Sequence, residues 1–436
     1  MTVSFVSLGC DKNLVDSEHM IADLCGNGYE LVDDENEADV AVINTCCFIH
    51  DAKQESIDSI LEMARLKDKK LKALIVCGCL AERYRDEIIK EIPEVDAVIG
   101  IGQSSDLVKA IDEALGKRSE RKDISRERVI TTPGHFEYLK IAEGCDKCCT
   151  YCIIPKIRGP YRSVPMEELL EEAAMLAKRG VKELILVAQE TTLYGTDLYG
   201  EKSLPELLCK LSGINGIEWI RILYAYPEEV TDELIDVMST NPKICHYIDI
   251  PIQSGSDDVL RRMGRRCTTG TIRDVVAKLR DKMDDICIRT TLIAGFPGET
   301  QEDFEQTYRF VNEMEFDRLG VFTYSAEEGT PAYELTPKVP EKTAKSRQAE
   351  LYELQQAVAY EAAQNMAGKT LRVIVDGYLP EDDVYVARSY KDAPDIDGLV
   401  FVYSTRELTT GDMIDVMIKE AKEYDLEGVL IDESAQ

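Results

Sequence analysis

No long apolar run occurs in the sequence, and this absence excludes a protein built on membrane-spanning helices. The longest apolar stretch beside a predicted helix, residues 73–81, is far shorter than the roughly 20 residues that a membrane span needs. Residues 7–10 (SLGC) resemble a lipoprotein cleavage site, but residues 1–9 carry no charged side chain and are too short for a signal peptide. We therefore expect a cytoplasmic protein without membrane contact.

Histidine and basic residues are also scarce. The four histidines form no spaced set, and no Ser-His-Asp pattern is present. With 51 basic and 82 acidic residues the net charge is −31, which disfavours a protein that binds nucleic acid over its whole surface. A basic protein partner fits this charge better. The 436 residues exceed one compact domain.

Cysteine, in contrast, is abundant, with 14 residues. Cytosolic thiols stay reduced, so clustered cysteines favour metal binding or catalysis over disulfides. Cys145, Cys149 and Cys152 form a C-x3-C-x2-C motif, which suits an iron–sulfur cluster with one iron left open to a small molecule. Zinc is the weaker alternative, because His135 precedes the strand before the motif and no fourth ligand follows at zinc spacing. We interpret Cys148 as a residue that does not bind the cluster, although a C-x2-C pair of Cys145 and Cys148 remains an alternative.

A second set of cysteines is spread over the first third of the chain. Cys10, Cys46 and Cys79 each follow a predicted buried strand. Because the carboxyl ends of parallel strands converge on one crevice, these thiols predict a second three-thiolate cluster. Singly, each would be a core cysteine. Cys47 and Cys77 stand close to the predicted ligands, so the choice within each pair is an inference.

Hydrophobic periodicity predicts an α/β protein in four parts. Residues 1–116 alternate strands (3–8, 40–43 and 74–76) with helices, which is typical of a doubly wound parallel sheet. Residues 117–134 include a charged, apolar-poor linker. Residues 135–367 predict a partial (β/α)6 barrel that ends in a long helix, 341–367, and whose active site lies at the strands' carboxyl ends. Its six predicted strands are 138–141, 183–187, 218–223, 247–250, 286–292 and 319–322.

The last part, residues 368–436, is rich in short β-type segments punctuated by glycine and proline. This pattern predicts a small antiparallel β-barrel. Residues 369–436 contain 16 acidic and 7 basic side chains, a balance of −9. Such a barrel should repel tRNA and attract a basic protein. The alternative is that the acidic surface only aids solubility.

The motifs SLGCDKN, NTCCF, CGCL, EGCDKCCTYCIIPKIRG, IPIQSGSDDVLRRMGR and IAGFPGET, in this order, resemble the radical S-adenosylmethionine (SAM) methylthiotransferases. The resemblance covers nearly the whole chain and includes the TRAM domain of that family. One branch modifies adenosine in tRNA, and another modifies an aspartate in a small-subunit ribosomal protein. VSLGCDKNLVDSE and YLKIAEGCDKCCTYCIIPKIRGPYRS resemble the second branch, although Asp11 replaces a proline that many relatives carry in this loop.

This resemblance implies a division of labour between two 4Fe–4S clusters. The cluster on the C-x3-C-x2-C motif would bind SAM through its open iron and reduce it, and the resulting radical would take hydrogen from the β-carbon of the aspartate. The cluster on the first set would hold sulfide that a second SAM methylates. A basic small-subunit ribosomal protein would be the substrate, recognised through the acidic C-terminal domain. An electron donor and a sulfur source would also be needed, and stable tRNA binding is not expected.

Candidate SAM contacts lie where predicted barrel strands end or beside the cluster. Tyr151 stands between two cluster ligands, and Arg265 could pair with the SAM carboxylate, with a surface salt bridge as its alternative. Loop packing is the alternative for the others. The full set is Tyr151, Gln189, Glu190, Pro251, Gln253, Arg265, Ile293 and Gly295. Three rival functions remain: a tRNA methylthiotransferase, a two-cluster electron-transfer protein and a zinc-stapled interaction protein.

Overall fold

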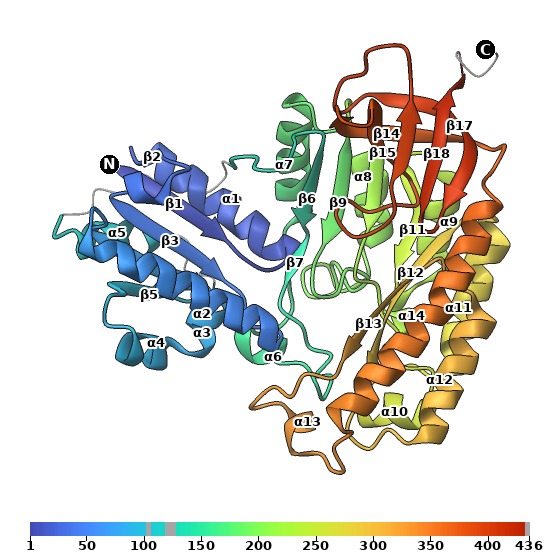
Figure 1. Cartoon of the computed structure of the whole chain (residues 1–436), viewed down its shortest axis with the longest axis horizontal. Coiled ribbons are helices and arrows are strands. Elements are labelled where there is room, and N and C mark those ends of the chain that lie inside the picture. Colours follow the sequence, from blue (N-terminus) through green and yellow to red (C-terminus); the bar gives the residue numbers. More distant parts are fainter. Residues whose placement is uncertain (102–105, 118–127, 432–436) are drawn as a thin grey trace.

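The computed structural model describes residues 1–101, 106–117 and 128–431, and it contains two parallel sheets, a closed barrel and a two-stranded hairpin (Figure 1). The predicted charged linker lies mostly outside the described residues, at positions 118–127. Within the described residues, no helix is long and apolar enough to cross a membrane.

The N-terminal part is a five-stranded parallel sheet in the order β2-β1-β3-β4-β5. Its strands are β1 (Thr2–Ser7), β2 (Glu30–Leu31), β3 (Val40–Thr45), β4 (Ala73–Gly78) and β5 (Ala97–Ile99). Its helices are α1 (Asp11–Gly26), α2 (His50–Ala64), α3 (Cys79–Arg83), α4 (Arg85–Glu91) and α5 (Leu107–Ala114). One apolar cluster packs α2, α3 and α4 on one face, and another packs α1 and α5 on the other. The predicted doubly wound fold is confirmed.

The central part is a six-stranded parallel sheet in the order β13-β12-β11-β10-β9-β6. Its strands are β6 (Phe136–Lys140), β9 (Glu183–Val187), β10 (Trp219–Ile222), β11 (Ile244–Asp249), β12 (Cys287–Ala294) and β13 (Arg318–Thr323). Chain order equals spatial order and the sheet does not close, as expected for a partial barrel. Between β6 and β9 a short hairpin forms from β7 (Ala142–Glu143) and β8 (Arg162–Ser163).

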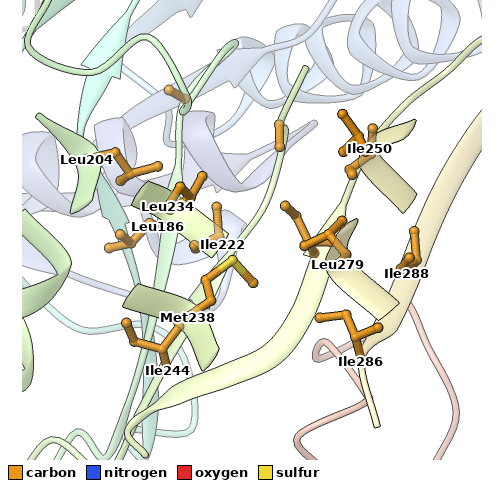
Figure 2. Packing of buried hydrophobic residues seen from close by; sticks show 14 of the residues in the cluster. Leu186, Leu204, Ile222, Leu234, Met238, Ile244, Ile250, Leu279, Ile286 and Ile288 are labelled. Atoms are coloured by element: carbon orange, nitrogen blue, oxygen red, sulfur yellow. The ribbon is translucent and has the colours of Figure 1, made fainter. Parts of the chain in front are cut away.

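Helices cover the outer face of this sheet. They are α7 (Met166–Lys178), α8 (Leu204–Ser212), α9 (Asp232–Thr240), α11 (Thr269–Lys282), α12 (Gln301–Met314) and α14 (Glu341–Gln364), with shorter α6 (Ile154–Ile157), α10 (Asp257–Arg262) and α13 (Pro331–Glu334) in loops. Leu186, Ile222, Leu234 and Met238 belong to the largest buried cluster, between strands and helices (Figure 2). Burial of this layer is the main source of stability for the partial barrel.

Helix α14 ends at Gln364, three residues before the predicted end, and turns lead to Gly368 at φ 79°. The helix also covers the edge strand β13. Gln348 Nε2 donates to the carbonyl of Val321 at 2.6 Å, and Tyr352 Oη accepts from the amide of the same residue at 3.1 Å. An edge strand otherwise leaves such backbone groups open to other chains.

The C-terminal part is a closed five-stranded barrel, as predicted. Its strands are β14 (Thr370–Leu379), β15 (Val384–Ser389), β16 (Val400–Tyr403), β17 (Met413–Lys422) and β18 (Asp425–Leu430). The neighbouring strands pair antiparallel except β16 and β18, which are parallel. The reason is connectivity: β17 closes the barrel against β14, and the β17–β18 hairpin returns beside β16. β18 was not among the predicted strands.

Buried ion pairs fix this barrel to the central sheet. Glu183 on β9 accepts from Arg388 Nη1 at 2.8 Å and from Arg221 Nε at 2.7 Å, and all three side chains are buried. Asp397 lies against Arg289 and accepts from the hydroxyl of Tyr247 at 2.7 Å. Part of the barrel's acidic charge is therefore used inside the molecule.

Candidate active site

The C-x3-C-x2-C motif occupies the loop after β7, at the carboxyl end of the central sheet. Cys145 and Cys149 are buried, whereas Cys148 is exposed and has a φ of 54°. Backbone hydrogen bonds hold this loop in place. The amide of Cys145 donates to the carbonyl of Gly159, and the amide of Thr150 donates to the carbonyl of Met263. The motif thus forms one fixed turn beside the strand ends.

The donor chemistry of this loop fits a cationic group. Burial, with a smaller contribution from the neighbouring thiols, raises the pKa of Cys145 to about 11 and that of Cys152 to about 12. Thiolates at neutral pH therefore require a positive centre such as an iron–sulfur cluster. In the described part of the chain, no three His, Cys, Asp or Glu side chains are gathered tightly enough for a single metal ion. The fit to a cluster rests on the donor type and on the shared loop.

Aromatic and basic side chains surround this cysteine loop. The hydroxyl of Tyr226 lies 3.7 Å from Cys149 Sγ, and the guanidinium of Arg265 lies 4.2 Å from the centre of the Tyr226 ring. Arg265 is buried, donates to the carbonyl of Pro251 at 2.8 Å, and leaves its Nε without a partner. A surface salt bridge for Arg265 is therefore excluded. Tyr151 packs edge-on against Phe296, with ring centres 6.5 Å apart.

Two further predicted contacts follow β9. Glu190 is fully buried; its Oε1 accepts from the amide of Thr192 at 2.9 Å, and its Oε2 has no partner. Burial raises the pKa of Glu190 to about 8. Gln189 donates from Nε2 to Glu143 at 3.0 Å, and its Oε1 also has no partner. An unpaired nitrogen on Arg265 and unpaired buried acceptors on Glu190 and Gln189 fit a ligand with both carboxylate and ammonium groups, which SAM carries.

The other predicted contacts have backbone roles in this structure. Gln253, at φ 71°, bridges to β12 through its amide to Thr291 at 2.8 Å, and its carbonyl accepts from Ile293 at 2.9 Å. Gly295, at φ 77°, lies so close to α14 that an added Cβ would collide with the side chain of Ala344. Packing explains these residues without a ligand.

The second cysteine set lies at the carboxyl ends of β1, β3 and β4. Cys10 precedes α1, Cys46 follows β3, and Cys79 begins α3. A Cβ on Gly9 would lie 2.9 Å from Cys46 Sγ, so the Cys10 loop packs directly on Cys46. Burial raises the pKa of both Cys46 and Cys79, and the nearby thiol of Cys10 contributes to the same direction. The three cysteines thus lie where the strands end, and the cluster that they would hold stays a prediction.

The neighbouring cysteines occupy core positions. Cys77 lies within β4, and its thiol donates to the carbonyl of Ile43 at 3.5 Å. Cys47 is buried in the apolar cluster beneath α2. Both placements favour Cys46 and Cys79 as the side chains available at the crevice.

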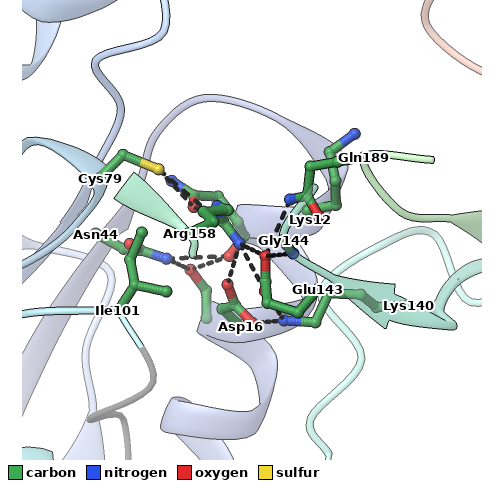
Figure 3. Close-up of polar contacts among 12 residues, drawn as sticks. Lys12, Asp16, Asn44, Cys79, Ile101, Lys140, Glu143, Gly144, Arg158 and Gln189 are labelled. Carbon is green, nitrogen blue, oxygen red and sulfur yellow. Dashed lines mark hydrogen bonds and ion pairs between the residues drawn. The ribbon is translucent and has the colours of Figure 1, made fainter. Parts of the chain in front are cut away.

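Arg158 links Cys79 of the second cysteine set to Glu143, which precedes the C-x3-C-x2-C motif (Figure 3). Its Nη2 donates to Asn13 Oδ1 at 2.5 Å and lies 3.5 Å from Cys79 Sγ, and its Nη1 donates to Glu143 Oε2 at 2.8 Å. Glu143 stands two residues before Cys145. Asp16 on α1 joins the network through Arg158 at 3.3 Å and through Lys140.

Sequence reasoning missed Arg158 and Tyr226. Arg158 lies six residues after the last cysteine of the motif, and Tyr226 follows β10 by four positions. The position of Tyr226 after a barrel strand was an available signal. No pattern distinguishes Arg158 from an exposed arginine, because three of its partners, Asn13, Asp16 and Cys79, come from the N-terminal part of the chain.

Three family models match the chain. "Uncharacterized protein family UPF0004" covers residues 2–100, "Radical SAM superfamily" covers residues 139–311, and "TRAM domain" covers residues 367–431. Solved structures with this fold include the radical SAM methyltransferase TsrM from Kitasatospora setae (TM-score 0.56, 14% identity, 85% of this chain and 80% of that one). The cobalamin-dependent radical SAM enzyme OxsB also matches (TM-score 0.53, 14% identity, 82% of this chain and 56% of that one). At this identity they show the fold alone.

Curated relatives extend over the full length. A protein of Lachnoclostridium phytofermentans named ribosomal protein uS12 methylthiotransferase RimO is 56% identical, over 98% of this chain and 99% of the relative. Two proteins of the same name also match. The one from Acetivibrio thermocellus is 48% identical over 100% of this chain and 99% of the relative, and the one from Thermoanaerobacter sp. is 49% identical over 98% and 99%. The chain therefore belongs to the RimO family of radical SAM methylthiotransferases.

Proposed function

We propose that this protein adds a methylthio group to the β-carbon of an aspartate in ribosomal protein uS12, with two 4Fe–4S clusters and SAM. The relatives bear the name of that substrate. The observation that carries the two-cluster proposal is Arg158, which contacts both Cys79 and Glu143 and so holds the two cysteine sets at one interface. The reaction belongs in the cytoplasm, where ribosomal proteins reside.

The radical step belongs to the site in the central domain. A cluster on Cys145, Cys149 and Cys152, when bound, supplies the electron that makes SAM a hydrogen-abstracting reagent. Arg265 and Glu190 would bind and orient SAM: the unpaired Nε of Arg265 would donate to its carboxylate, and the unpaired Oε2 of Glu190 would accept from its ammonium group. The apolar walls of this site exclude water from the reaction.

The sulfur step belongs to the N-terminal sheet. Cys10, Cys46 and Cys79 would hold the second cluster and the sulfur to be transferred. Arg158 places its positive charge 3.5 Å from Cys79 Sγ, which stabilises the anionic thiolate. A reductant and an inorganic sulfur source complete the set of partners.

Charge favours a protein over tRNA as the substrate. The exposed acidic residues of the barrel are Glu381, Asp382, Asp383, Asp395, Glu407, Asp415, Glu420 and Glu423. They give the barrel a surface that repels phosphate and attracts a basic protein. Asp397, which is paired with Arg289 and Tyr247 inside the molecule, is not part of this surface.

The test is anaerobic reconstitution with iron and sulfide, followed by SAM, a reductant and uS12. Peptide mass spectrometry should find a methylthio group on one aspartate, with 5′-deoxyadenosine as co-product. The triple variant with Cys10, Cys46 and Cys79 replaced by Ala should still cleave SAM but transfer no sulfur. Formation of 5′-deoxyadenosine with modification of tRNA and not of uS12 would overturn the substrate, and loss of SAM cleavage in the folded triple variant would overturn the division of labour.

A further inference from the structure

A groove of about 1120 Å³ lies between the N-terminal and central parts of the molecule. Helices α2 and α4 form one wall, and β13 with the start of α14 forms the other. Small-molecule pockets usually measure about 300–1,000 Å³. The volume thus leaves room for a segment of polypeptide.

Apolar side chains in this groove remain exposed. Ile57 and Leu61 on α2 are 37% and 42% exposed, and Phe322 on β13 is 52% exposed. Ile88 and Tyr84 continue the apolar lining. Large apolar side chains gathered on one hollow of a surface, rather than scattered singly, mark a binding site.

Carboxylates outnumber cations around these apolar side chains. Four acidic residues and two lysines line the groove: Asp51, Glu87, Glu91, Glu341, Lys53 and Lys345. Lys53 is held by Glu327 at 2.9 Å, and Lys345 by Glu341 at 2.6 Å. Both lysine charges are therefore neutralised within the protein, and the rim stays negative toward a partner.

Two lining residues of the groove lie next to residues that pack beside the cysteine sets. Leu80 directly follows Cys79 in the sequence. Tyr324 packs against Phe296 at 5.4 Å, and Phe296 contacts Tyr151 inside the C-x3-C-x2-C motif. The groove therefore borders the parts of the molecule that carry the two proposed cluster sites.

We propose that this groove is the docking surface for a loop of the substrate ribosomal protein, one that carries apolar and basic side chains next to the target aspartate. The proposal rests on the function proposed above and adds the surface through which the substrate enters. Apolar contacts with Ile57, Leu61 and Phe322 would supply affinity, and Glu87 and Glu91 would attract the basic side chains.

The experiment compares substrate binding with SAM cleavage in the reconstituted enzyme. In the Leu61→Glu/Phe322→Glu variant, we expect the KM for uS12 to rise about tenfold or more, since buried apolar anchors dominate such interfaces. Glu87→Lys/Glu91→Lys should also raise it, with a larger effect at low salt. Uncoupled formation of 5′-deoxyadenosine, without uS12, should stay at the wild-type level in both variants. Ile89→Glu is the matched control, because Ile89 is 53% exposed on α4 but lies outside the groove.

Each outcome separates the two proposals. If the wild type modifies uS12 and the groove variants modify it with an unchanged KM, the groove is not the docking surface. If the wild type leaves uS12 unmodified, the proposed function itself fails. Hydrogen exchange of the wild-type holoenzyme needs no variant: uS12 should slow exchange in α2 and β13, and unchanged exchange there during turnover would overturn the docking proposal.

Discussion

Glu190 is buried, and only one of its two carboxyl oxygens has a hydrogen-bond partner. Protonation of this carboxyl group therefore changes the free energy of unfolding measurably. Its pKa is about 8 in the folded chain, against an ordinary value of 4.5. As the pH rises, the unfolded chain releases this proton before the folded chain does. The free energy of unfolding therefore falls by up to about 1.4 kcal/mol per pH unit between roughly pH 4.5 and 8.

Glu190→Gln removes this dependence and keeps the acceptor for Thr192. In cluster-free protein, we expect the thermal midpoint of the variant to exceed that of the wild type increasingly as the pH rises from 5 to 8. Thermal unfolding at several pH values measures this difference. Glu233→Gln, at an exposed position, is the control and should show no such trend. A constant difference between Glu190→Gln and wild type would contradict the raised pKa.

The guanidinium group of Arg158 contacts residues of both the N-terminal and the central part of the molecule. Arg158→Lys keeps the charge but cannot reach Asn13, Cys79 and Glu143 together. A misplacement of about 1 Å costs a reaction roughly a hundredfold. We therefore expect SAM cleavage to persist while methylthio transfer falls by about that factor, measured as 5′-deoxyadenosine per modified uS12. Arg266→Lys, at an exposed position, should leave this ratio unchanged.

At the scale of elements, Gly295 shows how a strand end and a helix approach each other. Its φ of 77° is unfavourable for other residues, and an added Cβ would lie 3.2 Å from the Cα of Ala344 on α14. Gly295→Ala should therefore destabilise the protein by about 2–4 kcal/mol, from overpacking and backbone strain. Gly377→Ala on β14 is the control, because nothing lies within 4 Å of the added atom. Thermal unfolding of both variants measures the difference, and equal midpoints would show that α14 can move away.

The sequence predicted the elements that have strong periodicity. The runs that became β3, β4 and β9 are buried throughout and largely apolar, as is typical of parallel strands covered on both faces. β2, of two residues, and β5, of three, are too short for a pattern to emerge. β18 alternates apolar and polar residues but contains Gly428, which weakens a strand prediction.

The residues of the candidate site also fall into a group that the sequence could predict and a group that it could not. The cysteines could be placed because each follows a strand, and strand ends meet at one edge. Arg265, Glu190 and Arg158 owe their significance to burial and to missing or distant partners. Such properties arise from contacts between parts of the chain far apart in sequence, for example the 145 residues between Arg158 and Asn13.

At the scale of the whole molecule, Glu183 joins the C-terminal barrel to the central sheet. Arg388→Met leaves Glu183 with one of its two buried partners, and removing one member of a buried pair typically costs about 3–5 kcal/mol. We expect the barrel to become sensitive to limited proteolysis and the thermal midpoint to fall. Arg372→Met is the matched control, since its exposed pair with Glu218 contributes about 0–1 kcal/mol. Equal protease resistance in both variants would show that apolar contacts alone hold the barrel.

The edges of the sheets also limit the form in which a substrate can be recognised. The barrel β14–β18 is closed, and at the middle of β13 the backbone of Val321 is already bonded to Gln348 and Tyr352. An extended peptide therefore cannot be captured there by strand addition, the mode in which a peptide continues a sheet through its own main chain. At these two places a polypeptide can be recognised only through its side chains, which a prefolded loop presents in fixed positions. Unfolding uS12 should therefore lower its modification, even though the modified residue becomes more accessible.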